Sequence, residues 1–81
     1  MPYDIFYCSA FQSELGALSK DVQVAVWKKI SQIKEMPGHF DFLHKTDRIQ
    51  KARVGKYRIF FRVSGNSIEF MHVRKRDIAY K

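Results

Sequence analysis

The spacing of apolar residues predicts a short strand followed by a short helix at the start of the chain. Residues 3–8 are aromatic and β-branched, which is typical of a strand. After them, Phe11, Leu15 and Leu18 recur at i, i+4 and i+7, which places them on one face of a helix. Ser9 is the expected N-cap residue of this helix, because its hydroxyl can accept a hydrogen bond from a free backbone N–H.

A second, longer helix is expected from about Lys20 to Glu35. Its apolar stripe has the helical period and consists of Val22, Val26, Ile30 and Ile33. Ser19 is the expected N-cap, and Pro37-Gly38 ends the helix. Val24 and Trp27 lie off the stripe, which leaves two interpretations open. They either pack on the first helix or belong to an exposed patch that binds a partner.

Three strands are predicted in the second half of the chain. The clearest is Tyr57–Val63, in which the residues at alternate positions are apolar. Residues 49–54 and 67–73 have a similar character and flank it. Gly55-Lys56 and Ser64-Gly65-Asn66 are expected to form the tight turns that join these strands. Residues 39–47 have no clean period and connect the second helix to the first of the three strands.

Together these elements predict an α+β fold with the order β-α-α-β-β-β. Two consecutive helices would pack on one face of a small twisted antiparallel sheet and leave the other face partly open. The chain has 81 residues without a linker or a repeat, so residues 1–81 are expected to form a single domain. Such a small domain needs a core of large side chains, and an aromatic content of 15% supplies them.

The formal net charge of +7 indicates an anionic partner. Eleven of the fifteen Lys and Arg residues lie from residue 45 onward, together with only three acidic residues. A nucleic acid, an acidic protein or a membrane surface would complement this charge. An ordinary solvated surface is the alternative, although the basic residues concentrate on predicted strands and not on an exposed helix.

Several classes of protein are not indicated by the sequence. Residues 1–10 lack the basic start and long apolar run of a signal peptide, and no stretch approaches the roughly 18 apolar residues of a membrane-spanning helix. The single cysteine, Cys8, fits a reducing compartment, so a cytoplasmic location is expected. His39 and His44 are five residues apart, and no cluster of Cys or carboxylate residues completes a metal site with them, so we expect neither a metal site nor a cofactor.

The basic and aromatic residues of the predicted strands suit RNA. Strand alternation places Arg58 and Arg62 on one face, on either side of Phe60. Guanidinium groups bind phosphates, and aromatic rings such as Phe60 and Tyr80 stack on unpaired bases. The alternatives are an ordinary solvated strand face and, for Tyr80, a frayed terminus. If the strands are neighbours, further basic residues converge there: Lys51, Arg53, Arg74, Lys75 and Arg76.

RNA can be cut without a metal ion. The ribose 2′-hydroxyl attacks the adjacent phosphorus, and the 5′-oxygen leaves. The reaction needs a base, a cation that stabilises the charge growing on phosphorus, and an acid. Clustered positive charges favour the neutral form of a nearby lysine, which can then act as a base, whereas arginine keeps its proton. These considerations define a face that is compatible with RNA, but they do not define a reaction.

Two motifs stand out, one in the central hairpin and one near the C-terminal end. Residues 53–61 read Arg-Val-Gly-Lys-Tyr-Arg-Ile-Phe-Phe, and residues 74–80 read Arg-Lys-Arg-Asp-Ile-Ala-Tyr. The predicted helix pair ends in Lys-Glu-Met-Pro-Gly. In these features, and over nearly its whole length, the chain resembles the RelE/ParE toxin superfamily, closer to the RelE-like mRNA interferases. The resemblance implies the toxin of a type II toxin–antitoxin system that cuts messenger RNA on the ribosome and so inhibits translation.

The resemblance also implies roles for individual residues. Lys51 would be the catalytic base, and Arg58 would stabilise the phosphorane. Either Arg74 or Arg76 would assist the leaving oxygen, because the spacing to Tyr80 allows more than one alignment, and Tyr80 would stack on or orient a nucleotide. The expected RNA-binding residues are Arg48, Arg53, Phe60, Arg62 and Lys75.

Besides the spacing between the C-terminal arginines and Tyr80, the chain departs from the RelE-like pattern two positions before Lys51. A second basic residue often precedes the lysine by two positions, but Ile49 stands there in this chain, and Arg48 or Lys45 would have to replace it. His72, close to the C-terminal arginines, is either an acid–base group or a half-buried strand residue.

Two other functions remain open on the same fold. One is a ParE-like inhibitor of DNA gyrase, which binds without cutting, and the other is an inactive RNA-binding homologue. The set of basic residues favours RNA cleavage. In either toxin class the resemblance implies a cognate RelB-like antitoxin, whose binding segment should be acidic or amphipathic and fold on the toxin surface.

Overall fold

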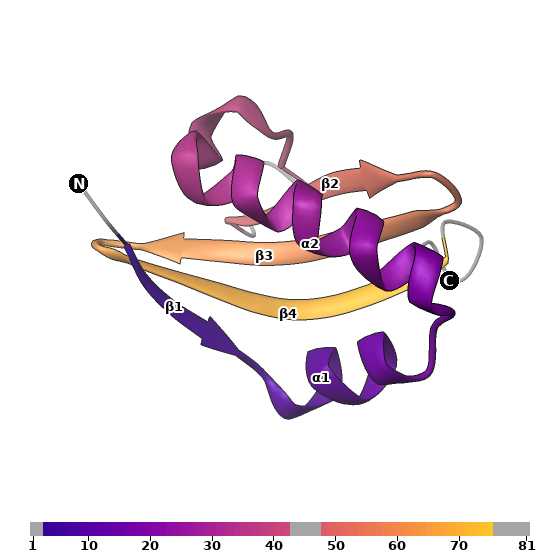
Figure 1. The fold of residues 1–81 in the computed structure, drawn as a ribbon. Helices are drawn as coiled ribbons and strands as arrows, with labels where there is room; N and C mark the ends of the chain where they lie inside the picture. The colour runs from indigo at the N-terminus through magenta and orange to yellow at the C-terminus, as the bar shows by residue number, and fades with distance from the viewer. Residues whose placement is uncertain (1–2, 43–47, 76–81) are drawn as a thin grey trace.

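The computed structural model describes residues 3–42 and 48–75 and has the predicted element order (Figure 1). None of the helices described is long and apolar enough to cross a membrane. The elements are β1 (Asp4–Tyr7), α1 (Ser9–Gly16), α2 (Lys20–Glu35), the short 3₁₀ helix η1 (Pro37–His39), β2 (Ile49–Val54), β3 (Tyr57–Ser64) and β4 (Ser67–Lys75).

The four strands form one sheet in the order β1-β4-β3-β2. Strands β2, β3 and β4 pair antiparallel as predicted, but β1 pairs with β4 in parallel, so the expectation of an entirely antiparallel sheet is corrected to a mixed sheet. The reason lies in the connection between β1 and β2. Helix α2 runs back across the sheet, so β2 starts from the same end as β1 and points the same way (Figure 1).

The helix boundaries follow local capping for α2 but not for α1. The Ser19 hydroxyl accepts a hydrogen bond from the backbone N–H of Val22, which confirms the predicted N-cap. The prediction for Ser9 is wrong, because Ser9 is the first helical residue and Cys8 takes the N-cap position without a side-chain bond. Cys8 still donates its backbone N–H to the Phe70 carbonyl at 3.0 Å, so pairing with β4 continues up to the start of α1.

The core lies between the two helices and one face of the sheet. Phe61 and Phe70 are completely buried on neighbouring central strands, and their ring centroids are 5.9 Å apart. The helices contribute the predicted apolar stripes: Phe11, Leu15, Val26, Ile30 and Ile33. A shift in the β3–β4 register between Phe60 and Phe61 keeps both Phe70 and Val73 on this face, although they are three residues apart.

Both hairpin turns open on a glycine in the left-handed region. Gly55 and Gly65 each have φ near 57°, a conformation that residues with a Cβ rarely adopt. The turns at 55–56 and 65–66 fix the pairing of β3 with its two neighbours. They therefore also fix which side chains share a face of the sheet.

We predict that Phe61→Ala lowers the free energy of unfolding by about 3–5 kcal/mol, because it leaves a cavity in the buried core. Urea denaturation followed by circular dichroism measures this loss. Phe42→Ala is the matched control, since the Phe42 side chain is 54% exposed and its removal should change stability little. Equal losses in the two variants would contradict the placement of the core.

Candidate nucleic-acid interface

The face of the sheet opposite the helices, here called the open face, carries most of the predicted site residues. Arg53, Arg58 and Arg74 are register partners on β2, β3 and β4, and so form one row across the sheet. Paired residues on neighbouring strands point to the same side. The next row contains Lys51, Phe60 and His72, and the third contains Ile49, Arg62, Glu69 and Phe6. Of the basic residues expected to converge on one face, the structure brings together Lys51, Arg53, Arg58, Arg62 and Arg74.

These side chains differ in how much of their surface solvent can reach. Arg53 and Arg74 are exposed at the ends of the arginine row, whereas Arg58 between them is only 5% exposed. Phe60 is 7% exposed, which differs from the expectation of an accessible ring for stacking. Lys51 is half-buried beside Phe60. The flanks of this face are therefore accessible from solvent, whereas Arg58 and Phe60 are covered.

The remaining predicted site residues are placed less centrally. Lys75 pairs with Tyr57, so strand alternation directs it to the helix-covered side of the sheet. Arg48 precedes β2 in a left-handed conformation, with φ near 57°, and is exposed near Arg62. Arg76 and Tyr80 lie outside the described residues, and their roles stay predictions.

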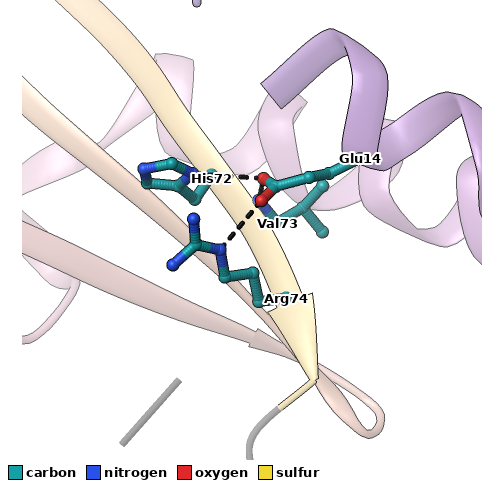
Figure 2. A network of polar contacts seen from close by, with 4 residues as sticks. All are labelled: Glu14, His72, Val73 and Arg74. Carbon is teal, nitrogen blue, oxygen red and sulfur yellow. Dashed lines mark hydrogen bonds and ion pairs between the residues drawn. The ribbon is translucent and has the colours of Figure 1, made fainter. Parts of the chain in front are cut away.

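Glu14 of α1 organises the edge of β4 next to the arginine row (Figure 2). Strand β1 pairs with β4 only as far as Phe70, and α1 covers the edge beyond it. There the Glu14 carboxylate accepts hydrogen bonds from the Val73 backbone N–H at 3.1 Å and from Arg74 Nε at 2.8 Å. His72 Nδ1 lies 3.2 Å from the same carboxylate. The Arg74 guanidinium is thereby held at a fixed position on the sheet.

The electrostatics of Glu14 follow from these contacts. Burial by itself raises the pKa of the Glu14 carboxyl, but the hydrogen bonds from Arg74, Val73 and His72 outweigh it, so the pKa is lower than usual. Glu14 therefore stays ionised near neutrality. The sequence did not indicate this residue, because Glu14 and its partners are 58 to 60 positions apart and no local pattern connects them.

A second carboxylate, Glu69, lies on the same face. Arg62 donates to it at 2.9 Å, and the Cys8 thiol lies 3.5 Å from its other oxygen. Desolvation and the hydrogen bond to Glu69 raise the pKa of Cys8, which disfavours the thiolate. This environment disfavours Cys8 as a nucleophile.

The two residues that lay off the helical stripe, Val24 and Trp27, are both exposed on α2. Trp27 meets the ring of Tyr7 edge to face, with centroids 5.5 Å apart, and lines a shallow groove shared with α1. It therefore packs toward the first helix while 44% of its surface stays exposed. Val24 is 55% exposed.

The fold of this chain is shared with solved structures of other proteins. No protein-family model and no curated protein sequence matched the chain. Among solved structures it is similar to a free-state mutant of the E. coli toxin RelE, with a TM-score of 0.83 and 19% identity, covering 99% of this chain and 90% of that one.

Two further solved structures extend the comparison. The toxin–antitoxin complex RelBE2 from Mycobacterium tuberculosis matches with a TM-score of 0.79 and 18% identity, covering 94% of this chain and 100% of that one. The ParDE system from P. aeruginosa matches with a TM-score of 0.72 and 9% identity, covering 90% and 95%. At these identities the likeness establishes the fold: the chain has the RelE-like α+β fold.

We predict that Glu14→Gln lowers the free energy of unfolding at neutral pH by about 1.5–3 kcal/mol, because hydrogen bonds to a charged carboxylate are lost. Since the folded-state pKa is depressed, the contribution of Glu14 is fully present above its ordinary value of 4.5 and is lost as the pH falls through the folded value. Glu14→Gln should therefore show a weaker fall in stability below that pH than the wild type.

Urea denaturation at a series of pH values measures both effects. Glu35→Gln, which removes an exposed carboxylate at the end of α2, controls for the loss of one negative charge. A Glu14→Gln variant as stable as Glu35→Gln at neutral pH would show that the network contributes nothing.

Proposed function

We propose that this chain is the toxin of a type II toxin–antitoxin pair and that it inhibits translation by cutting messenger RNA on the ribosome. The observation that carries the proposal is the row Arg53, Arg58 and Arg74, with Lys51 in the adjacent row. Like charges at opposing positions destabilise a sheet. A row of three arginines is therefore not explained by stability, but it would bind a polyanionic ligand. The likeness to RelE structures supports the same reading.

The proposed reaction is metal-independent attack of a ribose 2′-hydroxyl on the adjacent phosphorus. Lys51 takes the proton of the attacking hydroxyl, and Arg58 stabilises the charge that develops on the phosphorane. Arg53 binds a phosphate at the exposed edge of the same row. Arg74, or alternatively Arg76, assists the departing 5′-oxygen, and Tyr80 orients a nucleotide. Glu14 serves this chemistry indirectly, because it holds Arg74 by its Nε atom and leaves the terminal nitrogens of the guanidinium for a ligand.

The burial of Arg58 adds a requirement to this mechanism. Only 5% of Arg58 is exposed, so its guanidinium offers little accessible surface to a phosphate of bound RNA. We propose that engagement of the ribosome and its message exposes Arg58. Free RNA in solution should then be a poor substrate, in keeping with an enzyme that depends on the ribosome.

The proposed partner is an antitoxin with an acidic or amphipathic binding segment. The exposed flanks of the open face are basic and would attract such a segment electrostatically. The RelE structures from M. tuberculosis and E. coli include complexes with antitoxin. Such a pair would act in the cytoplasm, where ribosomes are found.

A ParE-like gyrase inhibitor is the second candidate, because the ParDE structure shares the fold. The two candidates differ in chemistry: a gyrase inhibitor needs a binding surface but no acid–base residue. Loss of activity on changing Lys51 alone, with binding retained, would favour the nuclease. Supercoiling by gyrase in the presence of the protein tests the alternative directly.

We predict that the wild-type protein stops synthesis in a cell-free translation extract and leaves discrete cuts in the message only when ribosomes are engaged. Primer extension maps the cuts. Lys51→Ala should slow cutting by about 10²-fold or more, the usual contribution of a general acid–base group. Arg58→Ala should also abolish cutting, and Arg58→Lys tests whether charge alone suffices at this buried position.

Lys28→Ala is the matched control, because it removes one positive charge from the exposed surface of α2 and should cut like the wild type. Translation that continues with an intact message would refute the nuclease proposal. Inhibition of gyrase supercoiling by the same preparation would then support the ParE-like function.

A further inference from the structure

His72 lies on the open face, but none of the roles proposed above uses it. It belongs to the row of Lys51 and Phe60, as the register partner of Phe60. Of its side chain 30% is exposed, so a ligand on this face can reach it. Arg74 follows two residues later on β4 and therefore points to the same side of the sheet. The imidazole thus stands beside the residues to which the proposed reaction is assigned.

The Glu14 carboxylate determines which nitrogen of His72 is available to a ligand. His72 Nδ1 lies 3.2 Å from Glu14 Oε1 (Figure 2). Glu14 is ionised near neutrality because its pKa is lowered, and an ionised carboxylate only accepts hydrogen bonds. Nδ1 therefore carries the proton in this contact. Nε2, the other nitrogen of the ring, is left to exchange a proton with a ligand.

Glu14 is itself held firmly, so it can orient the ring. Its carboxylate accepts the Val73 backbone N–H at 3.1 Å and Arg74 Nε at 2.8 Å, and only 25% of its side chain is exposed. A carboxylate that binds Nδ1 and leaves Nε2 free keeps a histidine in the tautomer and orientation that proton transfer requires. Glu14 and His72 have this relation, although they are 58 residues apart in the chain.

The proposed cleavage needs a proton donor for the 5′-oxygen, and the described residues given a role so far do not include one. Lys51 removes the proton of the 2′-hydroxyl, so it cannot at the same time protonate the leaving group. Arg58 and Arg74 keep their protons, because a guanidinium is not deprotonated in proteins, and they can only stabilise charge. An imidazolium, in contrast, gives up a proton readily near neutral pH.

We propose that His72 is the general acid of the reaction and that Glu14 is its positioning residue. The 2′-oxygen attacks phosphorus while its proton passes to the neutral amine of Lys51. The bond from phosphorus to the 5′-oxygen breaks, and this oxygen takes the proton from Nε2 of the His72 imidazolium. The products are a 2′,3′-cyclic phosphate and a 5′-hydroxyl, after which Lys51 loses a proton to solvent and His72 regains one. The proposal rests on the proposed function, since it takes RNA cleavage to occur on the open face.

The placement of Lys51 and His72 agrees with the geometry of such a displacement. The attacking and leaving oxygens stand roughly in line on opposite sides of phosphorus, so the base and the acid act from opposite sides. Strand β3 lies between the strands of Lys51 and His72, which separates their backbones by roughly 10 Å. A phosphate seated over Phe60 would have the lysine on one side and the imidazole on the other.

Replacement of the leaving oxygen by sulfur tests for the acid directly. Primer extension first maps a cut made by the wild type. Two synthetic messages are then prepared that differ only in the atom, oxygen or sulfur, that joins this phosphorus to the 5′-carbon. A thiol is far more acidic than an alcohol, so a thiolate leaves without taking up a proton.

The test variant is His72→Asn, because the amide nitrogen of asparagine replaces Nδ1 and still donates to Glu14, whereas an amide is not an acid. Cutting is measured in a single turnover on ribosomes loaded with each message. His72→Asn should cut the oxygen message about 10²-fold more slowly than the wild type. It should cut the sulfur message at close to the wild-type rate, which also shows that the variant is folded.

Three further variants make the test specific. Lys51→Ala should be slow on both messages, because the base acts on the 2′-hydroxyl and not on the leaving group. Glu14→Gln should slow the oxygen message more than the sulfur message, whereas a general loss of folded protein would slow both equally. His39→Ala removes an exposed histidine of η1 and should cut both messages like the wild type.

The outcomes separate the role of His72 from the proposed function. His72→Asn that cuts the oxygen message as fast as the wild type, or that is equally slow on both messages, would overturn the role of general acid. The wild type still cuts the message in both cases, so the proposed function would stand. A wild type that leaves the message intact on ribosomes would overturn the proposed function and the acid role together.

Discussion

The antiparallel pairing of β3 with β4 is the interaction on which the rest of the structure depends. These two strands are the centre of the sheet, and each has a strand on its other side. Their helix-covered face carries Phe61 and Phe70, around which the core forms. Their other face carries Arg58 and Arg74 as register partners. A single register therefore determines both the packing of the core and the arrangement of charge on the open face.

The pairing also creates an electrostatic problem that the fold has to accommodate. Three arginines in one row repel each other, and the domain is too small to offset much repulsion with its core. Glu14 relieves part of this repulsion because it pairs with Arg74 at the edge of β4. Glu69 pairs instead with Arg62, at the other end of the open face. Glu14 has a second structural function, since it accepts the Val73 N–H where β1 no longer pairs. The Glu14 carboxylate thus accepts a backbone hydrogen bond at the edge of the sheet and also holds Arg74 in place.

The open face is heterogeneous in a way that bears on function. One end combines arginines with a half-buried lysine, which suits phosphate chemistry. The other end is a hollow lined by Phe6, arginines, serines and a carboxylate. Arg58, in the middle of the arginine row, and Phe60, in the adjacent row, are covered. The open face is thus accessible at its flanks and covered at Arg58 and Phe60.

Much of the local structure could be predicted from the sequence, because it depends on short-range patterns. The apolar stripe and Ser19 cap defined α2, and glycines that adopt positive φ defined both hairpin turns. Strand alternation correctly put Arg58, Phe60 and Arg62 on one face. The Ser9 prediction failed because β1 pairing extends to Cys8, which is a long-range contact with Phe70. The burial of Arg58 and Phe60 could not be predicted, because strand alternation gives the face to which a side chain points but not whether other residues bury it.

By itself, then, the sequence determined the element order, the apolar stripes, the turns and the excess of positive charge, all of which arise from neighbours a few residues apart. Only the tertiary structure decided the parallel pairing of β1, the network around Glu14 and the hollow beside Phe6. Each of these joins segments that are distant in the chain, and their partners are selected by packing and register. No local spacing encodes such contacts, because the physical interactions that select them exist only once the sheet has formed.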